Sequence, residues 1–597
     1  MPATVVAIEV SVGVAVPAGA SLVVLESMKM EHVVTAPCDG VVRAIAIAPG
    51  DTVRADELLV EIDETEVGAH RAEPRPVGRA PGSIRPDLAE VLERHAIGSD
   101  ERRPDAVARR RERARRTARE NLADLVDPDS LVEYAPLVVA AQRRRRSLGE
   151  LIERTPADGL VGGIATVDGV RIVAMSYDYM VLAGTQGLWN HQKKDRLFEL
   201  AERLRAPVVF FTEGGGGRPG DTDGVGVAGL DCLAFHLFAR LSGTVPLIGI
   251  VSGYCFAGNA ALLGCCDVVI ATRDANIGMG GPAMIEGGGL GVYEPAAIGP
   301  AEEQFRAGVV DVLVDDERAA VATAKQYLAY FAPRGDPTGE RAWECVDQRA
   351  LRDVVPENRV RAYDVRGVID VMFDTDSVLE LRAGFGPGVI TALARIEGRP
   401  LGVVANNPAH LGGAIDSDGS DKGARFLQLC DAFELPIVLL CDTPGFMVGP
   451  ESERAGAVRH MSRLFVAGAN LRVPTGTIVL RKGYGLGAQS MAGGSFKAPR
   501  FCVAWPTGEF GGMNLEGAVR LGMRRELDAI TDPAEREAAF QAMLGRMYDA
   551  GKALNMASHF EIDDVIDPAD SRRWISRLLD DPDRVPSPRH RAFIDTW

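Results

Sequence analysis

The stretch Glu26-Ser27-Met28-Lys29-Met30-Glu31 lies where the two halves of an internal repeat meet. Both halves alternate apolar and polar residues around a glycine turn, which is typical of β-strands. The pattern predicts a flattened β-sandwich of two similar halves, with Lys29 in the turn that joins them. The repeat consists of Val5, Ala7, Ile8, Gly13, Val16, Ala18, Leu22 and Val23, which recur with the same spacing as Val42, Ala44, Ile45, Gly50, Val53, Ala55, Leu59 and Val60.

A lysine at the tip of a rigid hairpin can carry a covalent group between distant sites. Residues 1–63 resemble the biotinyl domain of biotin-dependent carboxylases, in the lysine between Met28 and Met30 and in the turns at 36–40 and 50–53. Ser27 stands where that family usually has alanine. The resemblance implies biotin attached to Lys29 by a biotin protein ligase. An unmodified surface lysine is the alternative, and lipoyl domains usually place their lysine between Asp and Ala instead.

Length and charge limit the class of protein. At about 150 residues per domain, the 597 residues suggest roughly four units. The net charge of −17 makes general nucleic-acid binding a poor prospect. Two arginine-rich runs, 102–119 and 143–146, either face phosphates and other anions or form a solvated or subunit-facing surface.

The cysteine pattern and the hydropathy indicate a cytoplasmic protein. The nine cysteines are odd in number and show no CxxC spacing, which favours free thiols in a reducing compartment. No metal site is therefore expected. No apolar run approaches the length that spans a membrane, so we expect no membrane association.

The chain divides into a biotinyl domain (1–63), a Pro-rich flexible linker (64–86), a first α/β domain (87–330), a connection (331–358) and a second α/β domain (359–597). In each α/β domain, a buried apolar strand runs into a glycine-rich loop that opens a helix, and this order occurs twice. The loops are 214–217, 253–258, 445–449 and 483–487. Two strands, Leu160–Val167 and Val170–Tyr177, are predicted to form a hairpin around Asp168-Gly169. The predicted helices are Leu188–Leu204, Gly229–Leu241, Asp421–Phe433 and Gly456–Ala469.

A glycine loop at the start of a helix exposes backbone N–H groups that can approach a negative charge closely. None of the four loops has the spacing of a nucleotide-binding loop, and no Gly-x-Ser-x-Gly nucleophile elbow is present. The remaining interpretation is that paired backbone donors in these loops stabilise an oxyanion. Four loops at matching positions in two repeats favour this role over simple turns.

Residues from about 117 to 580 resemble the carboxyltransferase of acyl-CoA carboxylases, which has tandem crotonase-like (ClpP/crotonase) ββα-superhelix domains. The matching motifs lie mainly in the second half, at 420–426, 430–433, 442–446, 481–485 and 504–507. The first half departs from the family at 213–218 and 253–260. Because the first half builds the acyl-CoA site in the family, the identity of the acyl group is not fixed by the resemblance.

The resemblance implies transfer of the carboxyl group from carboxybiotin on Lys29 to the α-carbon of an acyl-CoA, giving a malonyl-CoA-type product. Backbone donors at Gly215 and Gly216 would hold the thioester oxygen, and Ala257, Gly258 and Glu451 would line the substrate site. A second oxyanion hole, for the ureido oxygen of biotin, would be formed by Gly445, Phe446, Gly449, Gly485 and Leu486. His191, Lys193 and Lys194 either contact CoA phosphates or lie on a solvated face, and His460 is either functional or structural.

The chain has no room for an ATP-grasp domain, so the resemblance implies a separate biotin carboxylase subunit. It also implies a homo-oligomer, expected to be a hexamer, with each site shared between two subunits. Two alternatives remain open at this point. One is a decarboxylase that runs the reverse transfer, and the other is a non-catalytic carrier or assembly subunit.

Overall fold

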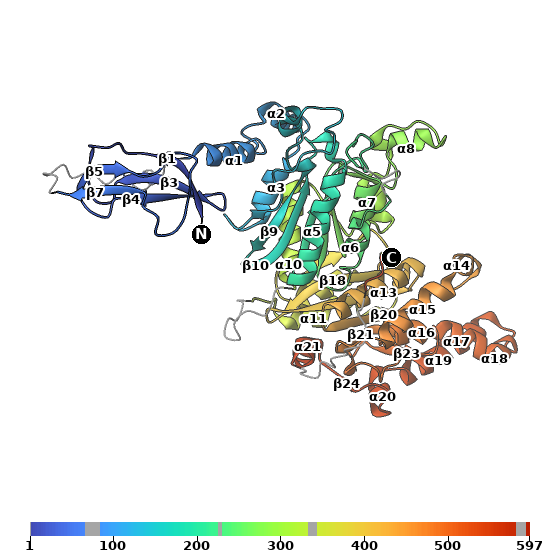
Figure 1. Ribbon diagram of the computed structural model, residues 1–597. Helices are drawn as coiled ribbons and strands as arrows, with labels where there is room; N and C mark the ends of the chain where they lie inside the picture. Colours follow the sequence, from blue (N-terminus) through green and yellow to red (C-terminus); the bar gives the residue numbers. More distant parts are fainter. Residues whose placement is uncertain (1, 66–83, 225–229, 332–342, 581–592) are drawn as a thin grey trace. The chain divides into compact units, whose positions relative to one another are not determined.

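The computed structural model describes residues 2–65, 84–224, 230–331, 343–580 and 593–597, in two compact units, Met1–Val91 and Leu92–Trp597 (Figure 1). The predicted linker falls largely, and the predicted connection partly, outside the described residues. So does the start of the helix predicted at 229–241, of which the structure describes α6 (Ala234–Ala239).

The first unit contains the predicted flattened sandwich of two small sheets, with strand orders β4-β3-β1-β6 and β2-β5-β7. Its core comes from both copies of the repeat, since Val5 and its counterpart Val42 are buried together with Val16 and Val53. The strands are β1 (Ala3–Ile8), β2 (Ala15–Val16), β3 (Ser21–Ser27), β4 (Met30–Thr35), β5 (Gly40–Ile45), β6 (Thr52–Val53) and β7 (Val60–Glu64).

The first half of the second unit is built on a seven-stranded sheet in the order β16-β14-β12-β11-β10-β9-β8. The hairpin of β9 and β10 has the predicted bounds, and β10, β11, β12, β14 and β16 are parallel. The strands are β8 (Val132–Glu133), β9 (Leu160–Val167), β10 (Val170–Tyr177), β11 (Val208–Phe211), β12 (Leu247–Val251), β14 (Val268–Thr272) and β16 (Val312–Val314), and a separate pair joins β13 (Tyr254–Phe256) to β15 (Asn276–Gly278).

Helices cover both faces of this sheet. Alternate residues of β10 point to opposite sides: Val173 and Met175 pack with α5 (Leu188–Leu204), whereas Ile172 and Ala174 pack with α3 and α10. The other helices of this half are α1 (Pro86–Ala96), α2 (Pro104–Glu112), α3 (Ala118–Leu125), α4 (Leu148–Arg154), α7 (Gly258–Gly264), α8 (Pro282–Gly287), α9 (Ala301–Arg306) and α10 (Glu317–Ala329).

The second half repeats this plan, with the strand order β17-β18-β19-β20-β21-β22-β24 and β23 paired to β21. A sheet that starts with an antiparallel hairpin and continues in parallel strands therefore occurs twice, as predicted for the tandem fold. The strands are β17 (Leu379–Leu381), β18 (Val389–Ile396), β19 (Arg399–Asn406), β20 (Ile437–Thr443), β21 (Thr475–Tyr484), β22 (Phe501–Ala504), β23 (Glu509–Gly511) and β24 (Asp564–Val565).

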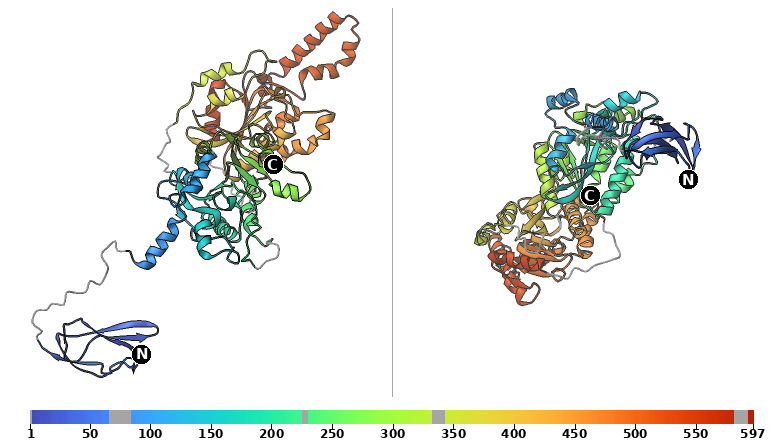
Figure 2. Two further views of the ribbon diagram at one scale, coloured as in Figure 1. Left: turned by 90° about the horizontal axis from the view of Figure 1, so that it is seen from above. Right: turned by 60° about the vertical axis from the view of Figure 1, so that its left-hand side comes forward.

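One hydrophobic cluster joins the two halves, because α3 and α10 of the first half pack in the same cluster as α13 and the strands of the second sheet. The carboxyl-terminal residues also touch both halves, since Ile594 exchanges hydrogen bonds with Ser242, and the N–H of Asp595 donates to Gln428. Helices α17 and α19 form a hairpin that projects from the second half (Figure 2, orange-red). The helices are α11 (Leu351–Val354), α12 (Arg366–Met372), α13 (Ser417–Ala432), α14 (Pro450–Arg454), α15 (Ala457–Ala469), α16 (Gly485–Ser490), α17 (Leu515–Gly522), α18 (Arg524–Asp528), α19 (Pro533–Ala550), α20 (Ala553–Ser558) and α21 (Ser571–Leu579).

Candidate active site

Lys29 occupies the tip of the β3–β4 hairpin. Ser27 pairs with Met30, and the two residues between them, Met28 and Lys29, have φ angles of 54° and 64°. Two residues of positive φ in a two-residue loop are the signature of a type I′ turn, which matches the twist of the flanking strands. Met28 and Met30 are both mostly exposed. The Lys29 amine makes no hydrogen bond or ion pair within the described chain, so the side chain fits a covalently attached group.

The glycine loops of the two halves occupy equivalent positions. β11 leads through Glu213 into Gly214–Gly217, and β20 runs through Asp442 into the turn that ends at Phe446. Gly217 forms a parallel bridge with Gln186, and Phe446 forms the same bridge with Ile415. The preceding residues, Gly216 and Gly445, both have positive φ (+88° and +123°), a conformation that favours glycine.

The second glycine loops of the two halves, 253–258 and 483–487, also occupy equivalent positions. Ala257, before α7, has φ 52° and Gly485, at the start of α16, has φ 57°. A Cβ placed on Gly216 would lie 2.7 Å from the Cβ of Ala257, so these two backbones are in contact. In the second half, a Cβ on Gly487 would lie 3.0 Å from the nitrogen of Phe446. The first and second glycine loops of each half are therefore in contact.

The hydrogen bonds identify which N–H groups remain available. Gly215 donates to the carbonyl of Ala183 (3.1 Å), and Gly216 donates to Oδ1 of Asn259 (3.0 Å). These two groups, which the sequence analysis named as donors, are thus already engaged. Across the described ranges, no partner is found for the N–H groups of Gly217, Gly258, Phe446 and Leu486, and the same pair is free in both halves. Gly449 (φ +121°) follows Phe446 on the same loop.

A carboxylate–arginine pair anchors each first loop. Arg110 of α2 binds both oxygens of Glu213 (3.0 and 2.8 Å), and Glu213 fills the space beside Gly253. Burial raises the pKa of Glu213, and the Arg110 guanidinium opposes that shift. In the second half, Asp442 accepts hydrogen bonds from Arg481 (3.1 Å) and the hydroxyl of Tyr363 (2.8 Å). Burial likewise raises the pKa of Asp442 against the effect of Arg481.

A buried polar chain supports the first loop from behind. The amine of Lys194 donates to Gln186 (2.8 Å), whose amide donates to Oδ1 of Asn259 (3.1 Å), the acceptor of the Gly216 N–H. Burial lowers the pKa of Lys194 to about 7. Both interpretations of Lys193 and Lys194 from sequence are wrong, because both amines are buried and neither side chain reaches a solvated face.

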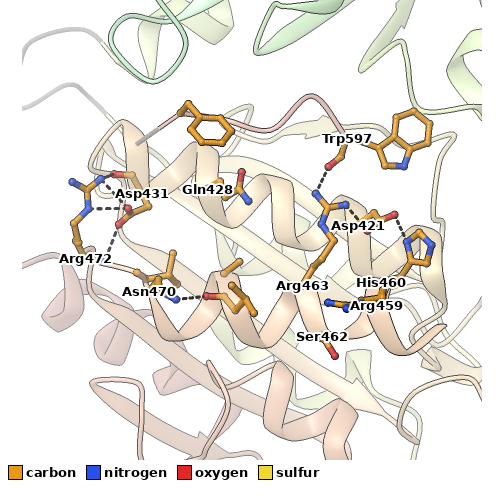
Figure 3. Close-up of a pocket in the computed structure, with 14 residues that line it drawn as sticks. Asp421, Gln428, Asp431, Arg459, His460, Ser462, Arg463, Asn470, Arg472 and Trp597 are labelled. Carbon is orange, nitrogen blue, oxygen red and sulfur yellow. Dashed lines mark hydrogen bonds and ion pairs between the residues drawn. The ribbon is translucent and has the colours of Figure 1, made fainter. Parts of the chain in front are cut away.

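The two histidines have local partners. His191 lies 3.0 Å from the sulfur of Cys232, and burial lowers its pKa to about 3. His460 of α15 lies 2.7 Å from Asp421 of α13, at a cavity of about 820 Å³ between the two helices (Figure 3). Arg463, which also lines this cavity, donates to Asp421 and to Asp595.

None of the residues that line this cavity belongs to the four glycine loops. Glu451, predicted to line the substrate site, is an exposed residue of α14. No cluster of three potential metal ligands occurs among the residues described, and no helix there is long and apolar enough to cross a bilayer.

Comparison with known proteins agrees with this geometry. The family model for the carboxyl transferase domain matches residues 109–583, and that for the biotin-requiring enzyme domain matches residues 1–62. The chain is 34% identical to the methylmalonyl-CoA carboxyltransferase 12S subunit of Propionibacterium freudenreichii subsp. shermanii, over 83% of this chain and 93% of that protein. It is 32% identical to the biotin-dependent long chain acyl-coenzyme A carboxylase beta4 subunit of Mycobacterium tuberculosis, over 82% and 93%.

Two solved structures resemble most of the chain. A single-chain, multi-domain long-chain acyl-CoA carboxylase is 56% identical with a TM-score of 0.79, and the match covers 97% of this chain but only 55% of that one. The transcarboxylase 12S subunit, solved as a hexamer with methylmalonyl-CoA, is 31% identical with a TM-score of 0.74, over 86% and 99%.

The fold and the two family matches define a biotin-dependent carboxyltransferase with a fused biotinyl domain. The chain belongs to the carboxyl transferase family and is the carboxyltransferase component of a biotin-dependent acyl-CoA carboxylase. The predicted fold and resemblance are confirmed. Sequence reasoning did not single out Arg110, Gln186 or Asn259. For Arg110 the only signal was its place in an arginine-rich run.

Proposed function

We propose that this chain carries biotin on Lys29 and moves a carboxyl group from it to the α-carbon of an acyl-CoA. The duplicated pair of free N–H groups carries the proposal, because the reaction develops negative charge on two oxygens, one on the thioester and one on the ureido ring. Lys29, which is exposed and has no partner among the described residues, supports it from the other unit. Biotin supplies the carboxyl group on a ureido nitrogen, and the backbone of this chain stabilises the charge.

In the first half, the N–H groups of Gly217 and Gly258 hold the thioester oxygen. Gly215 and Gly216 keep the loop in place through their bonds to Ala183 and Asn259. This assigns the donor role to Gly217 and Gly258 in place of Gly215 and Gly216, with Ala257 supplying the turn. Removing one such donor typically costs about 3–4 kcal/mol in the transition state.

In the second half, Phe446 and Leu486 provide the N–H groups that hold the ureido oxygen of biotin. Gly445, Gly449 and Gly485 supply the positive φ angles that this loop arrangement requires. When bound, biotin would supply a base for the α-proton of the thioester at the ureido nitrogen that gives up the carboxyl group, so no side chain need act as a general base.

The proposal includes partners that the chain itself does not supply. A separate biotin carboxylase loads the carboxyl group, and a biotin protein ligase modifies Lys29. The chain assembles as a hexamer, as its 12S relative does. Its nine free cysteines favour a cytoplasmic setting. The two long-chain carboxylases among the relatives favour a long acyl chain as the substrate.

Replacing the attachment residue tests the proposal. We expect Lys29→Ala to abolish carboxylation that depends on the carrier while leaving carboxyl transfer to free biotin measurable. Arg43→Ala, an exposed change in the same unit, serves as the control and should preserve both activities. Equal loss of both activities in Lys29→Ala would contradict the carrier role.

A further inference from the structure

Gln186 contacts both residues that present the free N–H groups of the first half. Its backbone forms the parallel bridge with Gly217. The N–H of Gln186 donates to the carbonyl of Gly216, and its carbonyl accepts from the N–H of Arg218, both at 2.8 Å. Its side chain lies against Gly258, since a Cβ placed there would lie 3.1 Å from Nε2 of Gln186. The position of Gln186 therefore sets how the two donors stand relative to each other.

The buried amine of Lys194 holds the side-chain amide of Gln186. It donates to Oε1 of that amide at a distance of 2.8 Å. An ammonium group has donors only, so it faces the oxygen of the amide and not its nitrogen. Nε2 of Gln186 is thereby directed at Oδ1 of Asn259 (3.1 Å), which also accepts the N–H of Gly216 (3.0 Å). The orientation of one amide is thus passed to the glycine loop.

The far end of this chain of hydrogen bonds has the same polarity. Nδ2 of Asn259 donates to the carbonyls of Gly184 (3.3 Å) and Thr212 (3.2 Å), which can only accept. Oδ1 of Asn259 is therefore an acceptor, and Gln186 must present its NH₂ group to it. With Lys194 at one end and Asn259 at the other, the Gln186 amide has a single satisfied orientation.

Stability alone does not account for a lysine at position 194. Burying an ammonium group is costly unless its charge is paired, and the two groups that accept from Lys194, Gln186 and the hydroxyl of Tyr177 (2.9 Å), are both uncharged. An apolar side chain of similar length could occupy the same place at lower cost. What the apolar side chain could not do is fix the direction of the amide that lies against Gly258.

We propose that Lys194 is a positioning residue for carboxyl transfer, which holds the Gln186 amide in one orientation and so keeps the N–H groups of Gly217 and Gly258 directed at one oxygen. The inference rests on the proposed function, in which that oxygen belongs to the thioester of acyl-CoA. Negative charge on this oxygen is greater in the transition state than in the bound substrate. Loss of the arrangement should therefore lower kcat more than it raises KM.

Two further variants separate this role from simple packing. Lys193 is also buried on α5, but its amine donates to the carbonyls of Leu160 and Ala135, so Lys193→Met removes a neighbouring buried lysine and leaves the amide chain intact. Gln186→Glu keeps an acceptor for Lys194, but its carboxylate cannot donate to Asn259. It therefore preserves the contact with the amine while reversing the polarity of the next hydrogen bond.

The test measures carboxyl transfer by the full chain from malonyl-CoA, unsubstituted or carrying a long alkyl group, to free biotin. We expect Lys194→Met to lower kcat by about tenfold to a hundredfold, with a smaller change in KM for the CoA donor and none in KM for free biotin. Gln186→Glu should show a loss of similar size, and Lys193→Met should keep the wild-type kcat. Amide hydrogen exchange of residues 214–217 should become faster in the first two variants and stay unchanged in Lys193→Met.

A wild-type kcat or unchanged loop exchange in Lys194→Met would overturn the inference, as would an equal loss of kcat in Lys193→Met. Should Lys194→Met fail to fold, Gln186→Glu decides the question, because wild-type kcat in that variant contradicts the role of amide polarity. If the wild type transfers carboxyl groups and all variants do so equally, only this inference fails. If the wild type uses neither CoA donor, the proposed function fails as well.

Discussion

The first glycine loops of the two halves, 214–217 and 445–449, have equivalent N–H groups but are held in place by different side chains. In the first half, the glycine run is held by Asn259 and by the carbonyl of Ala183. In the second half, Thr443 accepts the N–H of Gly445 (3.1 Å), and the backbone packs directly on Gly487. The common feature is backbone geometry, which the parallel bridges at Gly217 and Phe446 preserve. A backbone site can therefore diverge in sequence while its donors stay in place.

The carboxylate–arginine pairs that anchor these loops, Glu213–Arg110 and Asp442–Arg481, also differ between the halves. Asp442 is fully buried, and its arginine, Arg481, comes from the adjacent strand β21. Glu213 keeps 12% of its side chain exposed, and Arg110 reaches it from a helix distant in the sequence. The loop after β20 is thus fixed from within its own sheet, and the loop after β11 depends on α2, which precedes the first sheet in the sequence.

The largest effect should come from the buried anchor of the second half. We expect Asp442→Asn to lower the free energy of unfolding by about 3–5 kcal/mol, because it leaves Arg481 buried without its counter-charge. Glu213→Gln should have a smaller effect, since water reaches that pair. Urea denaturation of both variants compares them, and an equal or larger loss in Glu213→Gln would refute the asymmetry.

The side-chain amide of Asn259, which holds the first glycine loop, should affect the reaction of acyl-CoA and not that of free biotin. Asn259→Ala removes the acceptor of the Gly216 N–H, and the unmet donor costs about 1–3 kcal/mol. We expect kcat/KM for acyl-CoA to fall by at least about fivefold while the KM for free biotin is unchanged. Equal changes for both substrates would show that the two loops do not act on separate substrates.

Each half contains a buried lysine, and the two halves can be compared through the pH dependence of the free energy of unfolding. Lys422 of α13 has no hydrogen-bond partner in the described structure, and burial lowers its pKa from 10.5 to about 7. The unfolded chain therefore binds the extra proton between pH 7 and 10.5, so the lysine destabilises the fold fully below pH 7 and progressively less above it. Lys422→Met should stabilise the protein by about 1–3 kcal/mol at pH 6, with a gain that shrinks toward pH 10.

The corresponding change in the first half is the control for that measurement. Lys194 is equally buried but donates to Gln186 and Tyr177, so Lys194→Met leaves two polar groups without a partner. Thermal unfolding at pH 6 and pH 9 should show that Lys194→Met stabilises the protein less than Lys422→Met does, or destabilises it. A Lys422→Met variant whose gain grew with pH would contradict the assigned sign.

The smallest effect is expected at Thr443. Thr443→Val keeps the shape of the side chain and removes the hydroxyl that accepts the Gly445 N–H, which is worth about 0.5–1.5 kcal/mol. We expect a few-fold rise in the KM for free biotin and no change in binding of CoA. A change confined to CoA would reverse the assignment of the two loops.

Much of the fold was predictable because it is encoded locally. Apolar runs bounded by glycine gave the bounds of β9 and β10, and the repeat around Lys29 gave the sandwich core. The N–H donors of the first loop could not be predicted from the local sequence. Their identity depends on which N–H groups are already satisfied, and Asn259 and Ala183 reach the loop from distant positions in the sequence.

The buried lysines show the same limit. Lys193 and Lys194 have the charge of a surface patch, but their surroundings come from β9, β10 and the turn at 182–186. Arg110 stood in a basic run whose members differ in role, and only its contact with Glu213 sets it apart.

The account depends most directly on a covalent attachment at Lys29, which intact-mass spectrometry can measure after co-expression with a biotin protein ligase. We predict that the wild-type chain gains the mass of one biotinyl group and that Lys29→Ala gains none. No gain in the wild type, or a gain that persists in Lys29→Ala, would contradict the carrier assignment.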